Sequence, residues 1–428
     1  MCSSDLAYSY PHKTSYRSLD PTRPLRDVWQ HENQQSLFLY LHVPFCEFRC
    51  GFCNLFTFAN PSGDWMKRYV AQIRCEAEQV RHAIPDATFS RLAIGGGTPT
   101  FLEVDELAAL LQVATGIMGA QPKRIPVSIE ASPATATSEK LSLLREFGVD
   151  RLSLGVQTFD EDDSRKIGRP QRTSDVERTI AEVRSARFPV LNLDLIYGGE
   201  GQTMPAWLDS VKAAIAYQPE EIYLYPLYIR ELTGLGNKPH SWPDQRLPMY
   251  REARELLLSS GYEQVSMRMF RKPDASQDEG PVYCCQSDGM IGLGPGARSY
   301  CSTLHYSTEY AVGKSGVAAI LTDYLARPVA DFNSARYGFV LDDEERDRRY
   351  LILSLLQVAG LSRSDYVTRF GRDVMEAFPE LRELVSSGLV EEDESLRLTT
   401  VGLEWSEDRK STRLNSSHIP LSRMPSSA

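Results

Sequence analysis

The sequence predicts an α/β fold, in which a parallel sheet curls into a partial or full (β/α) barrel and is followed by a small winged-helix-like C-terminal domain. Short runs of β-branched and aromatic residues alternate with amphipathic helical runs over residues 36–229, the pattern of repeated strand–helix units. Polar or glycine-rich clusters follow strand after strand at its C-terminal end. Because that end carries the active site of a parallel barrel, the recurrence favours a barrel over a doubly wound open sheet.

Six strands separated by five helices are expected in the barrel. The strand runs are short and apolar, whereas the helical runs place apolar residues three and four positions apart. Gly148 ends one of these helices, as glycine often does. The expected strands are 36–43, 90–96, 125–132, 149–157, 190–198 and 221–229, and the expected helices are 64–84, 104–118, 138–148, 174–186 and 204–218.

The pattern changes after the barrel. A helix at 247–261 and a strand at 262–270 precede the glycine-rich stretch 284–300. From about Glu344, helical runs, the last of them at 374–388, and a hairpin at 389–402 predict the winged-helix-like domain. Its last helix and its hairpin are acidic, which favours a lid or packing module over a DNA reader.

These patterns divide the chain into five parts. They are an N-terminal extension (1–35), the barrel core (36–235), a barrel extension with the glycine-rich loop (236–330), the winged-helix-like domain (335–407) and a tail (408–428). Residues 1–6 and 409–428 break the periodicity, and we expect both to be disordered remnants of cloning or sequencing.

The composition is that of a globular protein outside membranes. Hydrophobic residues make up 42% and charged residues 24% of the chain, and no apolar run approaches the ~20 residues that span a bilayer. The N-terminus lacks the layout of a secretory signal, so we expect a cytoplasmic location. A net charge of −10 without a long basic run argues against a nucleic-acid partner.

Three cysteines stand directly after the first expected strand. Cys46, Cys50 and Cys53 form C-x3-C-x2-C. A zinc site needs a fourth ligand at suitable spacing. The nearby His42 is more simply interpreted as packing that shapes the loop. A [4Fe–4S] cluster fits three thiolates, because its fourth iron stays open for an exogenous ligand. The flanking aromatic residues, which would keep water away, are Phe45, Phe48, Phe52, Phe56 and Phe58.

The sequence resembles the radical S-adenosylmethionine (SAM) enzymes. Within them it is similar to the oxygen-independent coproporphyrinogen III oxidase-like (HemN-like) family, a branch that also contains haem chaperones and radical methyltransferases. The resemblance runs from about Phe38 to Gly402. It rests on the cysteine motif with YLHVPFC, GGGTPT, SIEASP, RLSLGVQTFD, IGRPQ, DLIYGG and IGLGPGARSY. It implies a barrel of the radical SAM type, a [4Fe–4S] cluster, one or two SAM molecules, and a reductant such as flavodoxin or ferredoxin.

The resemblance also implies roles for individual residues. SAM would chelate the open iron and be cleaved by one electron to methionine and a 5′-deoxyadenosyl radical. A glycine turn lets backbone approach the methionine amino group, and an arginine offers two parallel donors to its carboxylate. The implied SAM contacts are Tyr40, Phe52, Gly95, Gly96, Gly97, Thr98, Glu130, Gln157, Arg169, Asp194 and Ile196, with Tyr40 also a catalytic candidate and Ile196 a contact to a second SAM or to substrate.

Two departures from the family leave the substrate open. The true oxidases carry a further cysteine two residues after the third, where this chain has Leu55, and the haem chaperones carry a His–Asn…Tyr–Trp motif where this chain reads VYCCQSDGM. Cys284 and Cys285 in that stretch are catalytic candidates, as hydrogen-atom donors or ligands, or else small buried residues.

Our main interpretation is a radical SAM enzyme with oxidoreductase or methyltransferase chemistry on an unidentified small-molecule or tetrapyrrole-like substrate. Methyl transfer is one reaction it would support. The alternatives are coproporphyrinogen III oxidation in porphyrin biosynthesis, a haem-binding chaperone, and a zinc-binding structural protein.

Overall fold

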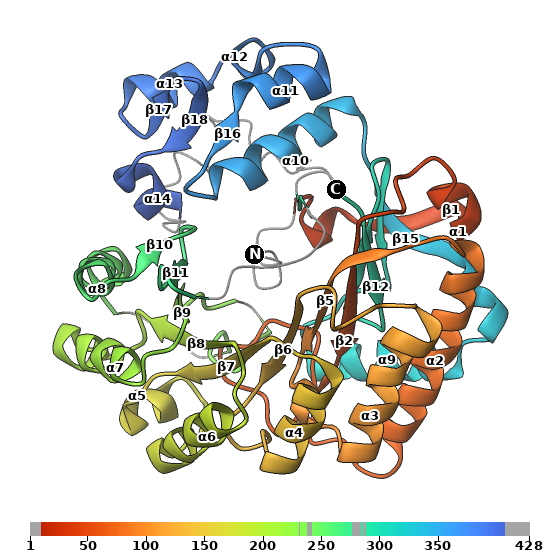
Figure 1. The fold of residues 1–428 in the computed structure, drawn as a ribbon, viewed down its shortest axis with the longest axis horizontal. Coiled ribbons are helices and arrows are strands. Elements are labelled where there is room, and N and C mark those ends of the chain that lie inside the picture. Colours follow the sequence, from red (N-terminus) through yellow and green to blue (C-terminus); the bar gives the residue numbers. More distant parts are fainter. Residues whose placement is uncertain (1–9, 231, 238–241, 276–283, 286–287, 407–428) are drawn as a thin grey trace.

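The largest unit of the molecule is a curved sheet. The structure, a computed structural model, describes residues 10–230, 232–237, 242–275, 284–285 and 288–406. Within them, thirteen strands pair in the order β1-β15-β14-β13-β12-β2-β5-β6-β7-β8-β9-β11-β10. The sheet bends strongly, with helices on its outer side (Figure 1). Since β1 (Arg17–Pro24) and β10 (Glu263–Gln264) are its two edges, the barrel is partial rather than closed.

Six parallel strands in chain order form the middle of the sheet, close to their expected bounds. They are β2 (Leu37–Val43), β5 (Phe89–Gly96), β6 (Val127–Ala131), β7 (Arg151–Gln157), β8 (Val190–Tyr197) and β9 (Glu221–Pro226). The connecting helices are α2 (Trp65–Ala83), α3 (Val104–Gln112), α4 (Ser138–Phe147), α5 (Glu161–Lys166), α6 (Thr173–Ser185) and α7 (Met204–Ala216). The expected helix 104–118 continues beyond α3 as a π-helical turn, Val113–Ile117.

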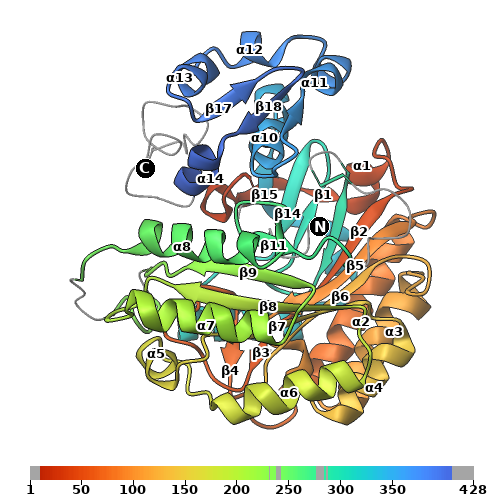
Figure 2. The ribbon, with the colours of Figure 1, turned by 60° about the vertical axis from the view of Figure 1, so that its left-hand side comes forward.

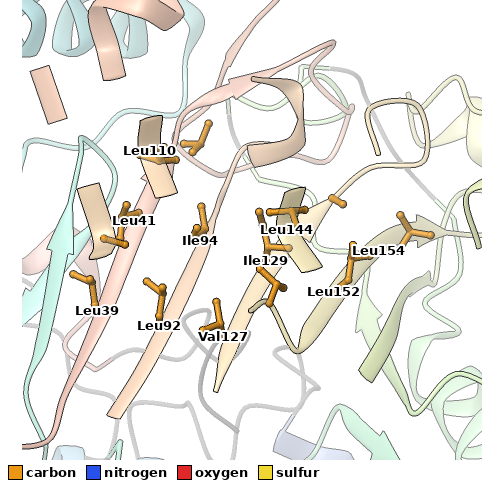
Figure 3. Close-up of a cluster of buried hydrophobic side chains, with 14 of the residues drawn as sticks. Leu39, Leu41, Leu92, Ile94, Leu110, Val127, Ile129, Leu144, Leu152 and Leu154 are labelled. Atoms are coloured by element: carbon orange, nitrogen blue, oxygen red, sulfur yellow. The ribbon is translucent and has the colours of Figure 1, made fainter. Parts of the chain in front are cut away.

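Side chains that alternate along the strands give the sheet two faces, an outer face that packs against the helices and a concave face. Leu39 and Leu41 on β2 and Leu92 and Ile94 on β5 point outward, and equivalent residues on β6 and β7 do the same (Figure 3). They pack against Leu110 of α3 and its counterpart Leu144 of α4. Successive side chains of a strand point to opposite faces. The residues between these leucines and isoleucines therefore face the concave side of the sheet.

Further strands extend the sheet on both sides. β12 (Met290–Leu293) pairs parallel with β2, and it is followed outward by β13 (Arg298–Tyr300), β14 (Leu304–Ser307), β15 (Ser334–Val340) and β1. On the other side, β11 (Met269–Arg271) pairs with β9, and β10 pairs with β11. Three more helices flank these strands: α1 (Leu25–Trp29), α8 (Arg246–Ser259) and α9 (Lys314–Ala326).

The prediction of a single strand at 262–270 is wrong. It is a tight pair of strands, β10 and β11, because the chain reverses at Ser266, whose hydroxyl accepts hydrogen bonds from the backbone N–H groups of Arg268 (3.4 Å) and Met269 (3.2 Å). A serine side chain that satisfies nearby backbone donors in this way stabilises a turn in place of a continuous strand.

The C-terminal part forms a separate domain with its own apolar core (Figure 2). Its core includes Leu351, Tyr366, Leu381 and Leu396. It consists of α10 (Asp343–Leu355), β16 (Leu361–Ser362), α11 (Arg363–Phe370), α12 (Val374–Ala377), α13 (Leu381–Ser386), β17 (Val390–Glu392), β18 (Ser395–Leu398) and α14 (Thr400–Ser406). The expected hairpin is present as β17 and β18.

Two expectations for this region need correction. The helix expected at 374–388 is broken into α12 and α13, because Pro379 has no backbone N–H for a helical hydrogen bond. The boundary expected at residue 335 falls inside β15 of the large sheet, so the C-terminal domain begins after that strand. The expected remnants, 1–6 and 409–428, lie outside the described residues. In the part of the chain that the structure describes, no helix is long and apolar enough to cross a membrane.

We predict that Glu221 on β9 is essential for stability. Its side chain is fully buried and accepts hydrogen bonds from Arg151 Nε at 2.6 Å and Arg271 Nη2 at 2.5 Å. Burial raises its pKa, but the two guanidinium groups reverse this and hold the pKa below its usual range. Glu221→Ala should lower the free energy of unfolding by about 3–5 kcal/mol, because it leaves two half-buried cations without their carboxylate.

Urea denaturation measures this loss. Asp209→Ala, which removes an exposed ion pair with Lys212 on α7, is the control and should change the free energy of unfolding by less than about 1 kcal/mol. Equal effects of the two variants would contradict the role of Glu221.

Candidate functional site

A cavity of about 450 Å³ opens on the concave side of the sheet, at the C-terminal ends of the parallel strands. The structure brings nearly all of the predicted site residues to its wall. These are Tyr40, Cys46, Cys50, Phe52, Cys53, Gly95, Gly96, Gly97, Thr98, Glu130, Gln157, Arg169, Asp194 and Ile196. They come from the cysteine loop, from five neighbouring strands (β2 and β5–β8) and the turns that follow them, and, for Arg169, from the segment between α5 and α6, which explains why they lie far apart in sequence.

The cysteine loop is closed at its base and tied to the barrel. Two short parallel strands, β3 (Phe45–Cys46) and β4 (Phe58–Ala59), pair at its ends. In the middle, the N–H of Gly51 donates to the carbonyl of Ile167 at 3.0 Å. A Cβ on Gly51 would lie 2.8 Å from that carbonyl oxygen, so only glycine fits this contact. The loop is therefore anchored at its base by β3 and β4 and in its middle by Gly51.

Each of the three thiols has a polar neighbour. Thr98 Oγ1 donates to Cys46 Sγ at 3.5 Å, Arg169 Nη1 donates to Cys50 Sγ at 3.2 Å, and Thr57 Oγ1 lies 3.8 Å from Cys53 Sγ. Burial raises the pKa of Cys46 to about 12 and also raises the pKa of Cys53. A neighbouring positive charge, such as that of bound iron, would favour deprotonation of these thiols.

The donor set fits an iron–sulfur cluster better than a single ion. Among the described residues, no group of three or more His, Cys, Asp or Glu side chains is arranged to hold one metal ion. A four-iron cluster instead takes one thiolate at each of several separate iron atoms. Three thiols on one loop, each with a polar neighbour, suit three separate iron atoms.

His42 has a structural role in this loop. Its Nε2 lies 3.0 Å from the carbonyl oxygen of Phe56 and its Nδ1 lies 3.2 Å from the hydroxyl of Tyr40. Burial lowers the pKa of His42 to about 4, so the ring is neutral. A Cβ on Gly96 or Gly296 would lie 2.5 Å or 2.7 Å from the ring. The ring is thus packed between two glycine turns, as the packing interpretation predicted, and it fixes the cysteine loop through Phe56.

The glycine turn after β5 lies against both the cysteine loop and Glu130. Gly96 has φ 114° and its N–H donates to Glu130 Oε2 at 3.0 Å. A Cβ on Gly95 would lie 2.9 Å from the Glu130 carboxylate, and one on Gly97 would lie 3.0 Å from Cys46 Sγ. The backbone of this turn therefore forms part of the cavity wall. A side chain at any of these three glycines would collide with the neighbouring residues.

Two carboxyl groups face the cavity next to this turn. Burial raises the pKa of Glu130 to about 7, and the nearby Asp194 adds to the shift. Burial also raises the pKa of Asp194, although Asn192 Nδ2 (2.7 Å) and Ser153 Oγ (3.0 Å) donate to its carboxylate. Both carboxyl groups would be stabilised in the ionised form by a cationic ligand.

Arg169 and Gln157 lie on the other side of the cysteine loop. Besides Cys50, the Arg169 guanidinium donates to the Gly155 carbonyl at 2.6 Å and to Gln171 Oε1 at 3.2 Å. Gln157 ends β7 with φ 68° after an irregularity in the pairing with β8. That conformation is uncommon for a residue other than glycine and is typical of functional sites.

Sequence reasoning missed a set of basic and aromatic residues in the cavity. They are Lys13, Arg151, Arg230, Arg268, Arg298, Tyr225, Tyr228, Tyr300 and Tyr310. Arg151 and Arg298 stand inside motifs that the sequence analysis used, so their position gave a usable signal. Lys13 comes from the N-terminal extension, where no pattern pointed to the site.

The structure does not bring Cys284 and Cys285 to this cavity. Neither belongs to its wall. The N–H of Cys284 donates to Asp288 Oδ2 at 2.7 Å, and the carbonyl of Cys285 accepts from Arg349 of α10 at 2.8 Å. Their neighbours 276–283 and 286–287 lie outside the described residues. The catalytic role expected for the pair stays a prediction without structural support.

Comparison with known proteins identifies the family of this chain. The family profile described as the radical SAM superfamily matches residues 40–214, and the profile of the HemN C-terminal domain matches residues 341–405. This chain is a radical SAM protein of the HemN-like family. The family implies a [4Fe–4S] cluster and SAM as cofactors.

The relatives of this chain include a heme chaperone and an oxygen-independent coproporphyrinogen III oxidase. The chain is 27% identical to the heme chaperone HemW of Bacillus subtilis, an alignment that covers 83% of this chain and 93% of that protein. It is 29% identical to the oxygen-independent coproporphyrinogen III oxidase of Cereibacter sphaeroides, over 89% of this chain and 90% of that protein.

A solved structure shows the same fold. Coproporphyrinogen III oxidase (HemN) from Escherichia coli, a radical SAM enzyme, superposes with a TM-score of 0.75 at 23% identity, covering 95% of this chain and 99% of that one. The partial barrel with its separate C-terminal domain is therefore the fold of this family.

We predict that Glu130 makes the stability of this HemN-like protein depend on pH. Its pKa of about 7, against an ordinary value of 4.5, means that the folded protein holds the proton more tightly than the unfolded chain. The stabilisation is complete below about pH 4.5 and is lost as pH rises through 7. At 1.36 kcal/mol per pKa unit, the loss is at most about 3 kcal/mol.

Glu130→Gln keeps an acceptor for the Gly96 N–H but cannot ionise. Without SAM, we expect it to equal wild type at pH 5 and to be more stable than wild type at pH 8.5, as measured by urea denaturation. Glu146→Gln, an exposed change on α4, should give the same small difference at both pH values. A gain for Glu130→Gln that does not depend on pH would contradict the assignment.

Proposed function

We propose that this protein binds a [4Fe–4S] cluster through Cys46, Cys50 and Cys53 and cleaves SAM reductively to methionine and a 5′-deoxyadenosyl radical. One observation supports the proposal most. The cysteine loop and the predicted SAM-contact residues, which are scattered from Tyr40 to Ile196, line a single cavity. When bound, the cluster supplies the electron that breaks a carbon–sulfur bond of SAM, and a flavodoxin or ferredoxin is the reductant that we propose.

The chain's own residues bind and orient the cofactors. Thr98 and Arg169 donate to two of the sulfur atoms, and such donors stabilise thiolates bound to iron. The guanidinium of Arg169 is planar, so it is suited to a carboxylate of SAM next to the cysteine loop. The wall of the glycine turn leaves room for the methionine amino group against backbone.

The two carboxyl groups complete the proposed SAM site. Glu130 and Asp194 lie on neighbouring sides of the cavity and are disfavoured in the ionised form without a ligand. A ligand that carries an ammonium and a sulfonium compensates for that cost, while ribose hydroxyls donate to the same oxygens. Phe52 and Ile196 provide apolar wall that excludes water from a radical.

Oxidation of a tetrapyrrole is the second candidate function. The relatives include an oxidase named for coproporphyrinogen III and a heme chaperone. Five cationic side chains apart from Arg169 line the cavity, and they suit a substrate with several carboxylates. Against the oxidase, Leu55 stands where the oxidases carry a cysteine, and it is 49% exposed at the cavity wall. Methyl transfer with two SAM molecules stays open, with Ile196 as a proposed contact.

We predict that the three cysteines are each required for SAM cleavage and that other thiols are not. Cys46→Ala, Cys50→Ala and Cys53→Ala should each abolish 5′-deoxyadenosine formation by anaerobically reconstituted, reduced protein. The reason is that each of the three cysteines would bind one iron atom of the cluster. Quantification of 5′-deoxyadenosine and of bound iron by chromatography and a colorimetric assay provides the measurement.

Cys75→Ala is the matched control, because Cys75 lies on α2 outside the cavity wall. It should retain iron and activity. Loss of activity in this variant equal to that in the loop variants would mean that the ligands are misassigned, and purified protein that holds zinc without iron would refute the cluster.

Products distinguish the candidate reactions. With coproporphyrinogen III under anaerobic conditions, an oxidase releases CO₂ and forms vinyl groups. A methyltransferase forms S-adenosylhomocysteine beside 5′-deoxyadenosine. A chaperone binds haem stoichiometrically without either product. We expect SAM cleavage in every case, and its absence in a protein with a full cluster would contradict the proposed function.

A further inference from the structure

A group of cationic side chains converges on one wall of the cavity, beside the cysteine loop. Lys13, Arg230 and Arg298 all line the cavity with Tyr310. The Lys13 Nζ lies 3.1 Å from the centre of the Tyr310 ring, which is close enough for a cation–π interaction. We propose that Lys13, Arg230 and Arg298 form a subsite that binds a carboxylate group of the substrate. The inference rests on the proposed function, because it assigns a substrate group to the same cavity.

Three distant segments build this wall. Lys13 lies in a short 3₁₀ turn (Lys13–Ser15) of the N-terminal extension, Arg230 follows β9, and Arg298 begins β13. The hydroxyl of Tyr310 donates to the carbonyl of Asn54, the residue after Cys53. Tyr310 therefore joins the cationic wall to the cysteine loop, so a bound carboxylate would be held at a fixed distance from the place where the radical forms.

Lys13 lies among groups of its own charge. In the part of the chain that the structure describes, no carboxylate lies within ion-pair distance of it. Burial lowers the pKa of Lys13 to about 7, and Arg298 and Arg230 lower it further because they carry the same charge. Cations held together in a partly dry cavity are unfavourable unless an anion joins them. A carboxylate would relieve this repulsion and accept charge-assisted hydrogen bonds.

Arg298 holds its place through aromatic contacts. It is half-buried and packs against Tyr16, with the guanidinium carbon 5.7 Å from the centre of that ring, and it lies near Tyr300 and Tyr310. An arginine fixed in this way presents its remaining donors in a defined direction. A free carboxylate group on a flexible substrate side chain would match this geometry, whereas an uncharged ester would not.

The experiment compares two probes that differ in charge. Coproporphyrin III carries four carboxylates, and its tetramethyl ester carries none. Each is titrated into the cluster-reconstituted full-length protein and followed by the change in its absorbance. Wild type should bind the acid at least tenfold more tightly than the ester. Lys13→Met should weaken binding of the acid about tenfold, the usual effect of one hydrogen bond to a charged group, and should leave the ester unchanged.

Two further variants are needed for interpretation. Lys13→Arg keeps the charge and should restore most of the affinity for the acid. Lys67→Met removes an exposed lysine on α2 and should match wild type for both probes. Iron content and circular dichroism identify any variant that fails to fold. Equal affinity of wild type for the two probes, no binding of either, or an equal loss for both in Lys13→Met would each overturn the proposal.

Failure of this subsite is distinguishable from failure of the proposed function. SAM cleavage by the same wild-type preparation is measured without any probe. If the cluster-loaded protein forms no 5′-deoxyadenosine but binds the acid in a charge-dependent way, the proposed function fails and the subsite stands. If cleavage occurs and binding does not depend on charge, the subsite alone is wrong.

Discussion

The parallel pairing of β2, β5, β6, β7, β8 and β9 is the constraint on which the rest of the structure depends. It sets the register so that Tyr40 lies beside Ala93 and Glu130 beside Ser153. With alternate residues on opposite faces, the leucines between them pack outward on the helices while the polar residues face the cavity (Figure 3). A shift of one residue would turn the carboxyl groups towards the helices and the leucines towards the cavity. The core and the site are therefore two faces of one set of strands.

When no ligand is bound, burial in the cavity disfavours the ionised forms of both acidic and basic side chains. Burial raises the pKa values of Cys46, Cys53 and Glu130, and burial lowers the pKa values of His42 and Lys13. The common cause is the loss of solvation for ionised groups. Cofactors that bring their own charges, such as iron, a sulfonium and a carboxylate, therefore compensate for costs that the fold has already imposed. This gives the site a preference for charged ligands in defined places.

Much of the site was predictable because its parts are local in sequence. The cysteine triplet, the glycine turn and the polar residues at strand ends each belong to a short motif, and the alternation of strands and helices placed those motifs at one end of a sheet. Local patterns were less informative where a single residue determines whether the backbone continues as a strand or helix. Ser266 turns an expected strand into two, and Pro379 breaks an expected helix. Such effects depend on one contact or one missing donor.

By itself, the sequence determined the fold class, the family, the three proposed cluster ligands and the order in which the proposed SAM contacts follow one another. Those properties depend on periodicity and on short motifs, which a linear chain displays directly. Only the tertiary structure decided that the barrel stays open, that Cys284 and Cys285 lie outside the cavity wall with Cys285 in contact with α10, and that Lys13 joins Arg230 and Arg298 on that wall. These are contacts between segments far apart in the chain, and they are selected by packing and by the cost of burying charge.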